Sequence, residues 1–248
     1  MRIFAAFAAF ATAIAAQPLA AQEIAYEVVL FEDVEVTFGP ASEVSGARFV
    51  SRKPDSVAQG HAAFGPFRVL DSERAALVGS TDRRSPAAFE SMMRAHPGIR
   101  VLEMRECPGT EDDLANLRLG RMIRAAGIVT YVPAGGSVRS GGVELFLAGA
   151  RRYADPEAEF AVHAWIDGEG READDFDASA PENRKYLDYY RQMGMSDSEA
   201  RAFYAMTNSV PFAEALWFDG AEMARWVRLD RYEEPKALAR LDLPAGLH

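Results

Sequence analysis

The stretch IVTYVPAGGSVRSGGVELFLAGARRYADPEAEFAVHAW, residues 128–165, carries the clearest structural pattern in the sequence. It predicts a strand over 128–132, a glycine-rich loop over 133–142, a mostly apolar helix over 143–150 and a second strand over 160–165. A strand, a helix and a second strand in this order are typical of a parallel βαβ unit with a right-handed crossover. This segment therefore favours the α/β class.

The same alternation extends toward the N-terminus. Strands are predicted over 67–70, 75–78 and 99–104. Helices are predicted over 85–95, beginning at Ser85-Pro86, and from Thr110 to Gly127. Before residue 65 the pattern changes to short β-branched and aromatic runs, over 26–31, 35–38 and 47–51. Residues 22–64 therefore predict a separate N-terminal β region.

The chain after residue 165 predicts a loop followed by helices. Residues 166–181 are acidic, contain glycine and lack periodicity, which is typical of a loop. Helices are predicted over 181–194, 196–206 and 219–226, and Ser196 with Glu199 matches the capping-box pattern. The sequence thus predicts one α/β domain over 65–248 with a mostly parallel sheet.

The first 21 residues have the pattern of a secretory signal peptide. Arg2 supplies a positive charge, residues 3–16 form an apolar run, and Leu19-Ala20-Ala21 supplies small residues that signal peptidase accepts. The run is shorter than the ~20 residues that span a bilayer, which argues against a retained anchor. We expect an exported protein, periplasmic or secreted, that begins at Gln22 and has no membrane span after cleavage.

The composition argues against several classes of function. A net charge of −10 over 248 residues makes nucleic acid a poor partner, because an acidic surface repels phosphates. The single cysteine, Cys107, cannot form an internal disulfide. The four histidines lie far apart in the sequence, and no histidine or cysteine pair has a metal-ligand spacing. We expect no metal and no cofactor.

Chemically useful groups follow three of the predicted strands. Binding and catalytic sites in parallel sheets lie at the carboxyl ends of the strands. The turn Cys107-Pro108-Gly109, then Ser140 and His163, all follow or end predicted strands, so we expect them to face one another. Ser140 could act as a nucleophile with His163 as its base. The N–H groups of Gly109 and Gly141, at helix starts, could stabilise an oxyanion.

From Gly65 to Asp230 the order of these segments resembles the Clp protease proteolytic subunit and, more closely, exported Clp-protease-like bacterial proteins of the Clp-protease/crotonase superfamily. The resemblance implies a spiral of βαβ units and a serine peptidase with Ser140 and His163 as catalytic residues. It also implies an oxyanion hole at Gly109 and Gly141. Glu214 is nearest to the spacing of the family's third catalytic residue, and Asn208 and Asp219 are alternatives. Relatives form rings or trimers, which implies a homo-oligomer.

The chain departs from the family in the turn, where Cys107 and Thr110 stand in place of the usual serine and glycine. The leading hypothesis is a serine peptidase or related hydrolase acting on a peptide or small acyl substrate. The main alternative is a catalytically degenerate binding protein on the same scaffold. Export disfavours a crotonase-type acyl-CoA enzyme, because CoA is cytoplasmic. A Ser–Lys dyad is disfavoured because no lysine can be placed near Ser140.

Two further features each allow two interpretations. Three arginines flank the predicted site: Arg139, Arg151 and Arg152. They could bind a substrate carboxylate or form salt bridges to the acidic loop. Cys107 at a helix start is either a reactive thiol or a small buried side chain.

Overall fold

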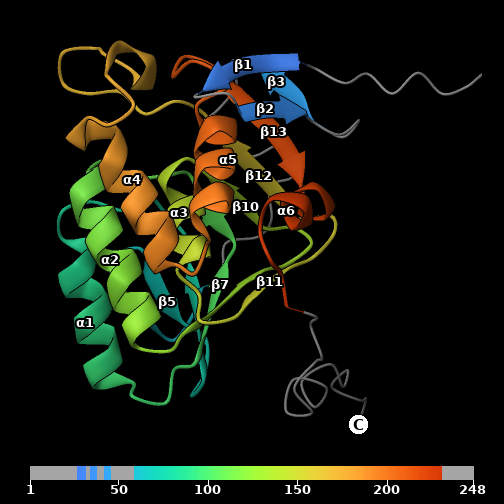
Figure 1. Cartoon of the computed structure of the whole chain (residues 1–248). Helices are drawn as coiled ribbons and strands as arrows, with labels where there is room; N and C mark the ends of the chain where they lie inside the picture. The colour runs from blue at the N-terminus through green and yellow to red at the C-terminus, as the bar shows by residue number, and fades with distance from the viewer. Residues whose placement is uncertain (1–26, 32–33, 38–41, 46–58, 231–248) are drawn as a thin grey trace, which may run out of the picture.

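The computed structural model describes residues 27–31, 34–37, 42–45 and 59–230. Within them, two main sheets of parallel and antiparallel strands pack against helices (Figure 1), so the predicted α/β class is confirmed. The predicted signal peptide over 1–21 and the predicted strand over 47–51 lie outside these residues. In the part of the chain that is described, no helix is long and apolar enough to cross a membrane.

The first sheet has six strands in the order β11-β9-β7-β6-β5-β4. The four strands β11, β9, β7 and β6 run parallel, and β5 and β4 continue the sheet in antiparallel fashion. The strands are β4 (Ala62–Phe64), β5 (Phe67–Val69), β6 (Arg74–Leu77), β7 (Val101–Met104), β9 (Val129–Val132) and β11 (Arg152–Ala154).

The second sheet has five strands in the order β3-β13-β12-β10-β8. Here β8, β10 and β12 run parallel, while β13 is antiparallel to both β12 and β3. The strands are β3 (Glu43–Ser45), β8 (Glu106–Cys107), β10 (Ser137–Arg139), β12 (Glu159–Val162) and β13 (Ala215–Asp219). Since β3 and β4 come from residues 22–64, those residues extend the two sheets of residues 65–248.

Each turn of the chain gives one strand to each sheet. β7 is followed by β8, β9 by β10 and β11 by β12, with α2 (Asp113–Ala125) after β8 and α3 (Gly141–Leu147) after β10. This repetition gives the predicted spiral of βαβ units, but with two sheets of mixed strand direction in place of one mostly parallel sheet.

Strand β10 lies inside the segment that the sequence predicts as a loop. Its polar residues do not match the apolar pattern that is typical of a buried strand, yet Ser137 and Arg139 are both buried. Ser137 Oγ donates to Glu159 Oε1 over 2.6 Å, and the guanidinium of Arg139 pairs with Glu106. Buried polar groups are stable only with such partners, and here β12 and β8 provide them on either side.

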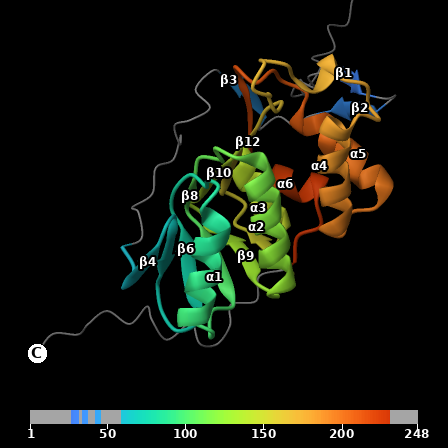
Figure 2. The same cartoon turned by 90° about the vertical axis from the view of Figure 1, so that its left-hand side faces the viewer.

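The main helices pack in two groups. Figure 2 shows α1 (Ser85–Ala95) in front of the six-stranded sheet, and α2 contacts both α1 and α3. In the second group, α4 (Pro181–Gln192) packs on α5 (Asp197–Thr207). Two further helical segments lie in the described part of the chain: the 3₁₀ turn η1 (Ala173–Asp175), inside the predicted acidic loop, and α6 (Gly220–Trp226).

The N-terminal caps of two helices can be compared with the capping residues that the sequence predicts. The capping box of α5 is confirmed, because Glu199 N–H donates to Ser196 Oγ and Ser196 N–H donates to Glu199 Oε2. Helix α2 begins two residues later than predicted, with Asp112 as its N-cap. Thr110 instead forms a parallel bridge with Thr81, which ties the turn at Gly109 to the chain after β6.

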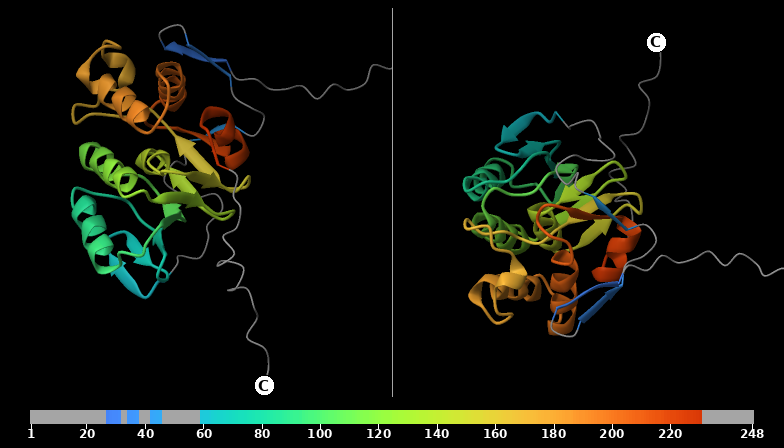
Figure 3. Two further views of the ribbon diagram at one scale, coloured as in Figure 1. Left: turned by 60° about the horizontal axis from the view of Figure 1, so that its bottom comes forward. Right: turned by 90° about the horizontal axis from the view of Figure 1, so that it is seen from above.

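A two-stranded unit stands apart from the main sheets. β1 (Glu27–Phe31) and β2 (Val34–Thr37) pair in antiparallel fashion within the predicted N-terminal β region. The two views of Figure 3 show this pair beside α5, which it contacts.

Helix α3 connects the core to the predicted site. All seven of its residues are buried. A Cβ placed on Gly142 would lie 3.1 Å from both the Cβ and the carbonyl oxygen of Cys107, so the helix packs directly on the end of β8. This close contact fixes the point at which Ser140 leaves the sheet.

Candidate active site

Three neighbouring strand ends form the site. β10 lies between β8 and β12, with Val138 opposite Cys107 and Arg139 opposite Ala161. The residues that follow these strands are therefore brought to one edge: the Gly109 turn after β8, Ser140 after β10 and His163 after β12. This agrees with the expectation that the three segments face one another.

Ser140 has an unusual backbone conformation. Its φ of 49° and ψ of −131° make it the only non-glycine residue with positive φ among the described residues. Such a conformation costs about 1–3 kcal/mol and persists only where the surroundings impose it. Here the Ser140 N–H donates to Ala161 O over 2.9 Å, and α3 begins at the next residue. A sharp strained turn from strand to helix also exposes the nucleophilic serine of α/β-hydrolases.

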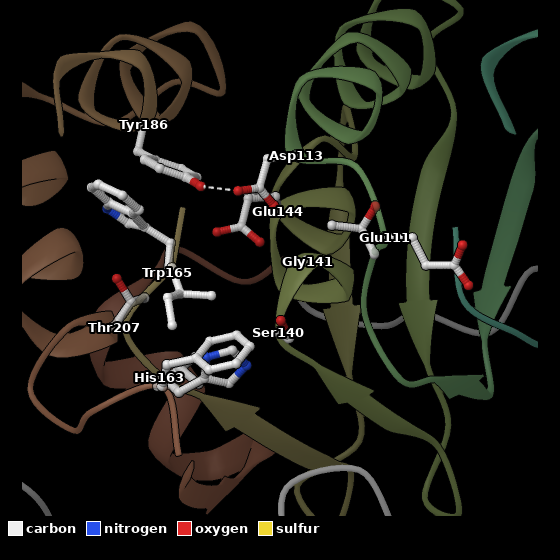
Figure 4. Close-up of a pocket in the computed structure, with 13 residues that line it drawn as sticks. Glu111, Asp113, Ser140, Gly141, Glu144, His163, Trp165, Tyr186 and Thr207 are labelled. Carbon is white, nitrogen blue, oxygen red and sulfur yellow. Dashed lines mark hydrogen bonds between the residues drawn. The ribbon is translucent and has the colours of Figure 1, made fainter. Parts of the chain in front are cut away.

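A pocket of about 270 Å³ opens beside Ser140. Ser140, Gly141 and His163 line it together, and Figure 4 shows the Ser140 and His163 side chains at the same end. The residues Val162, Trp165, Ile166 and Phe212 give it apolar and aromatic walls, and the residues Asp113 and Glu144 give it an acidic wall. Its volume suits a single side chain or a small acyl group.

A hydrogen bond and an aromatic contact hold the His163 ring. Its Nδ1 lies 2.8 Å from the carbonyl oxygen of Ala164, and Phe212 packs against the ring edge-on with centroids 5.1 Å apart. Because a carbonyl oxygen only accepts, Nδ1 carries a proton in this contact, and in the neutral form of the ring the lone pair is then on Nε2. This is the tautomer that a general base acting through Nε2 requires.

The structure does not bring the sequence-predicted acid to this histidine. Glu214 is exposed and does not line the pocket, although it directly precedes β13, the neighbour of β12. Asp219 lies opposite Glu159, at the far end of β12, and its carboxylate caps α6. Asn208 bonds through its amide nitrogen to Tyr204 O and Thr207 Oγ1 and lines a different cavity. The hydrogen-bond partner described for Nδ1 of His163 is instead the backbone carbonyl of Ala164.

Both predicted oxyanion segments lie against Ser140. A Cβ placed on Gly109 would lie 2.9 Å from Ser140 Cβ and 3.2 Å from Ser140 Oγ, and Gly109 itself has a φ of 128°. A Cβ on Gly141 would lie 2.6 Å from Thr110 Cγ2. Gly141 lines the pocket and Gly109 does not. In the turn that contains Gly109, the residue that lines the pocket is Thr110.

Asn116 is a positioning residue that sequence reasoning missed. It is buried in α2, where its Nδ2 donates to Gly141 O over 2.7 Å and its Oδ1 accepts from Thr81 Oγ1 over 2.8 Å. Thr81 N–H in turn donates to Gly109 O over 3.0 Å. One buried network thus joins the two backbone segments on either side of the nucleophile. An asparagine within a helix gives no local signal of this role.

Glu144 is the second residue that sequence reasoning missed. It lies on α3, four residues after the N-cap Ser140, and the residue is only 9% exposed. Tyr190 Oη donates to Glu144 Oε1 over 2.9 Å. Burial raises the pKa of Glu144 to about 7, and the nearby charge of Asp113 also raises it.

The flanking arginines and Cys107 do not line the pocket. Arg139 is buried against Ser137 and Glu106, and Arg152 donates to the backbone oxygens of Leu147 and Met193. The exposed Arg151 pairs with Asp230. None of the three pairs with the acidic loop in the contacts that the described residues make. Burial raises the pKa of the Cys107 thiol, so this residue has the buried rather than the reactive character.

The raised pKa of Glu144 predicts a pH-dependent effect on stability. A folded-state pKa of about 7 against 4.5 unfolded means that the folded protein holds this proton more tightly. The stabilising contribution is complete below pH 4.5 and is lost as the pH rises to about 7. Glu144→Gln should therefore match the wild type in acid and exceed it above pH 7 by up to ~3 kcal/mol in the free energy of unfolding. Urea unfolding at pH 4.5 and pH 8 measures this, and an equal difference at both pH values would contradict it.

Comparisons with known proteins give little beyond the geometry. No family model matches the sequence, and no curated protein matches it. Among solved structures, a point mutant of ClpP1 from Listeria monocytogenes matches with 14% sequence identity and a TM-score of 0.44, over 63% of this chain and 88% of that one. In the described residues, no group of three or more histidine, cysteine, aspartate or glutamate side chains could hold a metal ion.

Proposed function

We propose that this chain is a serine hydrolase that cleaves a peptide or acyl bond through Ser140 and His163, after export from the cytoplasm. One observation carries the proposal: a serine in a strained strand-to-helix turn shares a pocket with a histidine whose Nδ1 is anchored to a carbonyl oxygen. Each feature alone has a structural explanation. Together they supply a nucleophile, a base in the right tautomer and an enclosed volume for the substrate.

In the proposed reaction, Ser140 Oγ attacks the carbonyl carbon of the substrate and His163 Nε2 takes the hydroxyl proton. The new oxyanion accepts hydrogen bonds from backbone N–H groups at Gly141 and in the Gly109-Thr110 turn. As the intermediate collapses, the C–N or C–O bond breaks and the leaving group takes the proton from His163. Water, activated by the same histidine, then hydrolyses the acyl-serine and frees the enzyme.

The hydrogen bond between His163 Nδ1 and the carbonyl oxygen of Ala164 fixes the tautomer as a catalytic carboxylate would. A second candidate function is a binding protein that uses this pocket without catalysis. The turn favours it, because Cys107 and Thr110 stand where the proteins that the chain resembles usually have serine and glycine. A homo-oligomer remains a proposal that rests on the resemblance to Clp proteases.

Hydrolysis of small esters separates the two candidates. Purified protein should hydrolyse p-nitrophenyl esters of short N-acyl amino acids above the buffer rate, with saturation as the ester concentration rises. Stoichiometric treatment with a fluorophosphonate should stop this hydrolysis. Catalysis that survives complete labelling, or no catalysis at any ester concentration, would favour the binding protein.

A further inference from the structure

The pocket beside Ser140 has an acidic end. Figure 4 shows the carboxylates of Glu144 and Asp113 near Tyr186, away from the end that His163 occupies. Glu144 follows Ser140 by one turn of helix, which is about 6 Å along the helix axis. The acidic wall therefore lies within reach of a side chain whose backbone carbonyl is held at Ser140.

These carboxylates have hydrogen-bond donors but no counter-ion. Tyr190 Oη donates to Glu144, and Tyr186 Oη donates to Asp113 Oδ2 over 2.6 Å. Burial raises the pKa of both tyrosines, so their hydroxyls stay neutral. No arginine or lysine among the residues with described side chains forms an ion pair with Glu144 or Asp113. No ion pair among the residues with described side chains thus neutralises the two carboxylates at this end of the pocket.

The other walls suit a cation on an apolar stem. Trp165 and Tyr186 line the pocket with aromatic rings, whose faces attract cations. Lys185 already uses these two rings in this way, with its Nζ 5.2 Å and 4.9 Å from their centroids. Val162 and Ile166 add apolar side chains to the lining of the same pocket. An anionic group would meet the carboxylates of Glu144 and Asp113 there.

We propose that this pocket binds a positively charged group of the substrate, an ammonium or guanidinium on a short apolar stem, with Glu144 as its counter-ion. This inference rests on the proposed function, because it assigns the substrate class of the same site. Asp113 adds a second negative charge at the end of the pocket. The chain would accordingly cleave beside a basic group.

The test compares benzamidinium with benzamide, two planar molecules of similar shape that differ in charge. Binding is measured by calorimetry on the Ser140→Ala protein at pH 8, so that no turnover is needed. We expect benzamidinium to bind at least about tenfold more tightly. Glu144→Gln in the same background should reduce this preference to about twofold or less. Asp113→Asn is a second acidic-wall variant and should also weaken it.

A matched control is Glu90→Gln, which removes an exposed helical carboxylate on α1, outside the pocket. It should leave the preference unchanged. Lowering the pH from 8 to 6 should weaken benzamidinium binding, because Glu144 takes up a proton in this range. His163 also lines the pocket, so the Glu144→Gln protein shows whether Glu144 is the responsible group: the affinity of this variant should change less with pH.

Equal binding of the two molecules, or a preference that survives Glu144→Gln, would overturn the inference. These outcomes are distinct from failure of the proposed function. If the wild type reacts with fluorophosphonate at Ser140 but shows no preference for benzamidinium, the hydrolase survives and the substrate class is wrong. If the preference is present without any hydrolysis, the cation site stands in a binding protein.

Discussion

Ser140→Ala is expected to reduce ester hydrolysis by at least about 10³-fold, to the level of the uncatalysed rate plus binding effects. The reason is that the nucleophilic oxygen is removed while the pocket and the oxyanion donors remain. Stability should change little, because alanine meets the same backbone strain at this position and Ser140 makes no side-chain cap hydrogen bond. Initial rates with a p-nitrophenyl ester, together with thermal unfolding, measure both effects.

Ser91→Ala is the matched control for this substitution. Ser91 is a helical serine on α1, where its hydroxyl donates to Ala87 O, and it does not line the pocket. The control should keep full activity. A Ser140→Ala protein that is folded and retains more than a tenth of the wild-type rate would show that the nucleophile lies elsewhere.

His163→Ala is expected to lower the same rate by about 10²–10⁴-fold, the usual contribution of a positioned general base. Ser140 would then attack as a neutral hydroxyl with no group to take its proton. Combined with Ser140→Ala, the substitution should add almost nothing, because two residues that act as a unit are not additive. Rates of the two single variants and the double variant measure this coupling.

The control for the histidine is His61→Ala, an exposed histidine at the start of β4, far along the chain from the pocket residues. It should leave the rate unchanged. Additive losses in the double variant would mean that His163 acts through folding or substrate binding instead of through Ser140.

Local sequence patterns were sufficient to predict which segments meet. The alternation of strands and helices places the ends of successive parallel strands at one edge. Gly109, Ser140 and His163 follow β8, β10 and β12, so their shared edge follows from order alone. The capping box at Ser196 and the left-handed Gly127 after α2, with a φ of 66°, were likewise visible because each signal is contained within a few residues.

Features that depend on distant partners could not be predicted. β10 was not predicted as a strand because its buried Arg139 pairs with a residue of another strand, Glu106 on β8. The division of the strands into two sheets depends on how the chain crosses from one sheet to the other after each strand. The hydrophobic periodicity of the sequence does not indicate these crossings. Glu144 looks like an ordinary helical carboxylate until Tyr190, from a helix 46 residues further along, is placed against it.

The third catalytic position illustrates the same limit. Spacing favoured Glu214, and the chain does bring the start of β13 close to the end of β12 in the sheet order. Whether a side chain there turns toward His163 is decided by packing, and Glu214 remains exposed. The group that does contact Nδ1 is a backbone carbonyl, which no residue identity can reveal.

Tandem mass spectrometry after labelling of the native protein with a fluorophosphonate directly tests whether Ser140 is a nucleophile. Such a probe forms a stable phosphonyl ester only with a serine that is activated as a nucleophile. We expect one adduct per chain, located on Ser140, and none when the protein is denatured before labelling. An unlabelled Ser140 after prolonged exposure to excess probe, or an adduct on another serine, would contradict it.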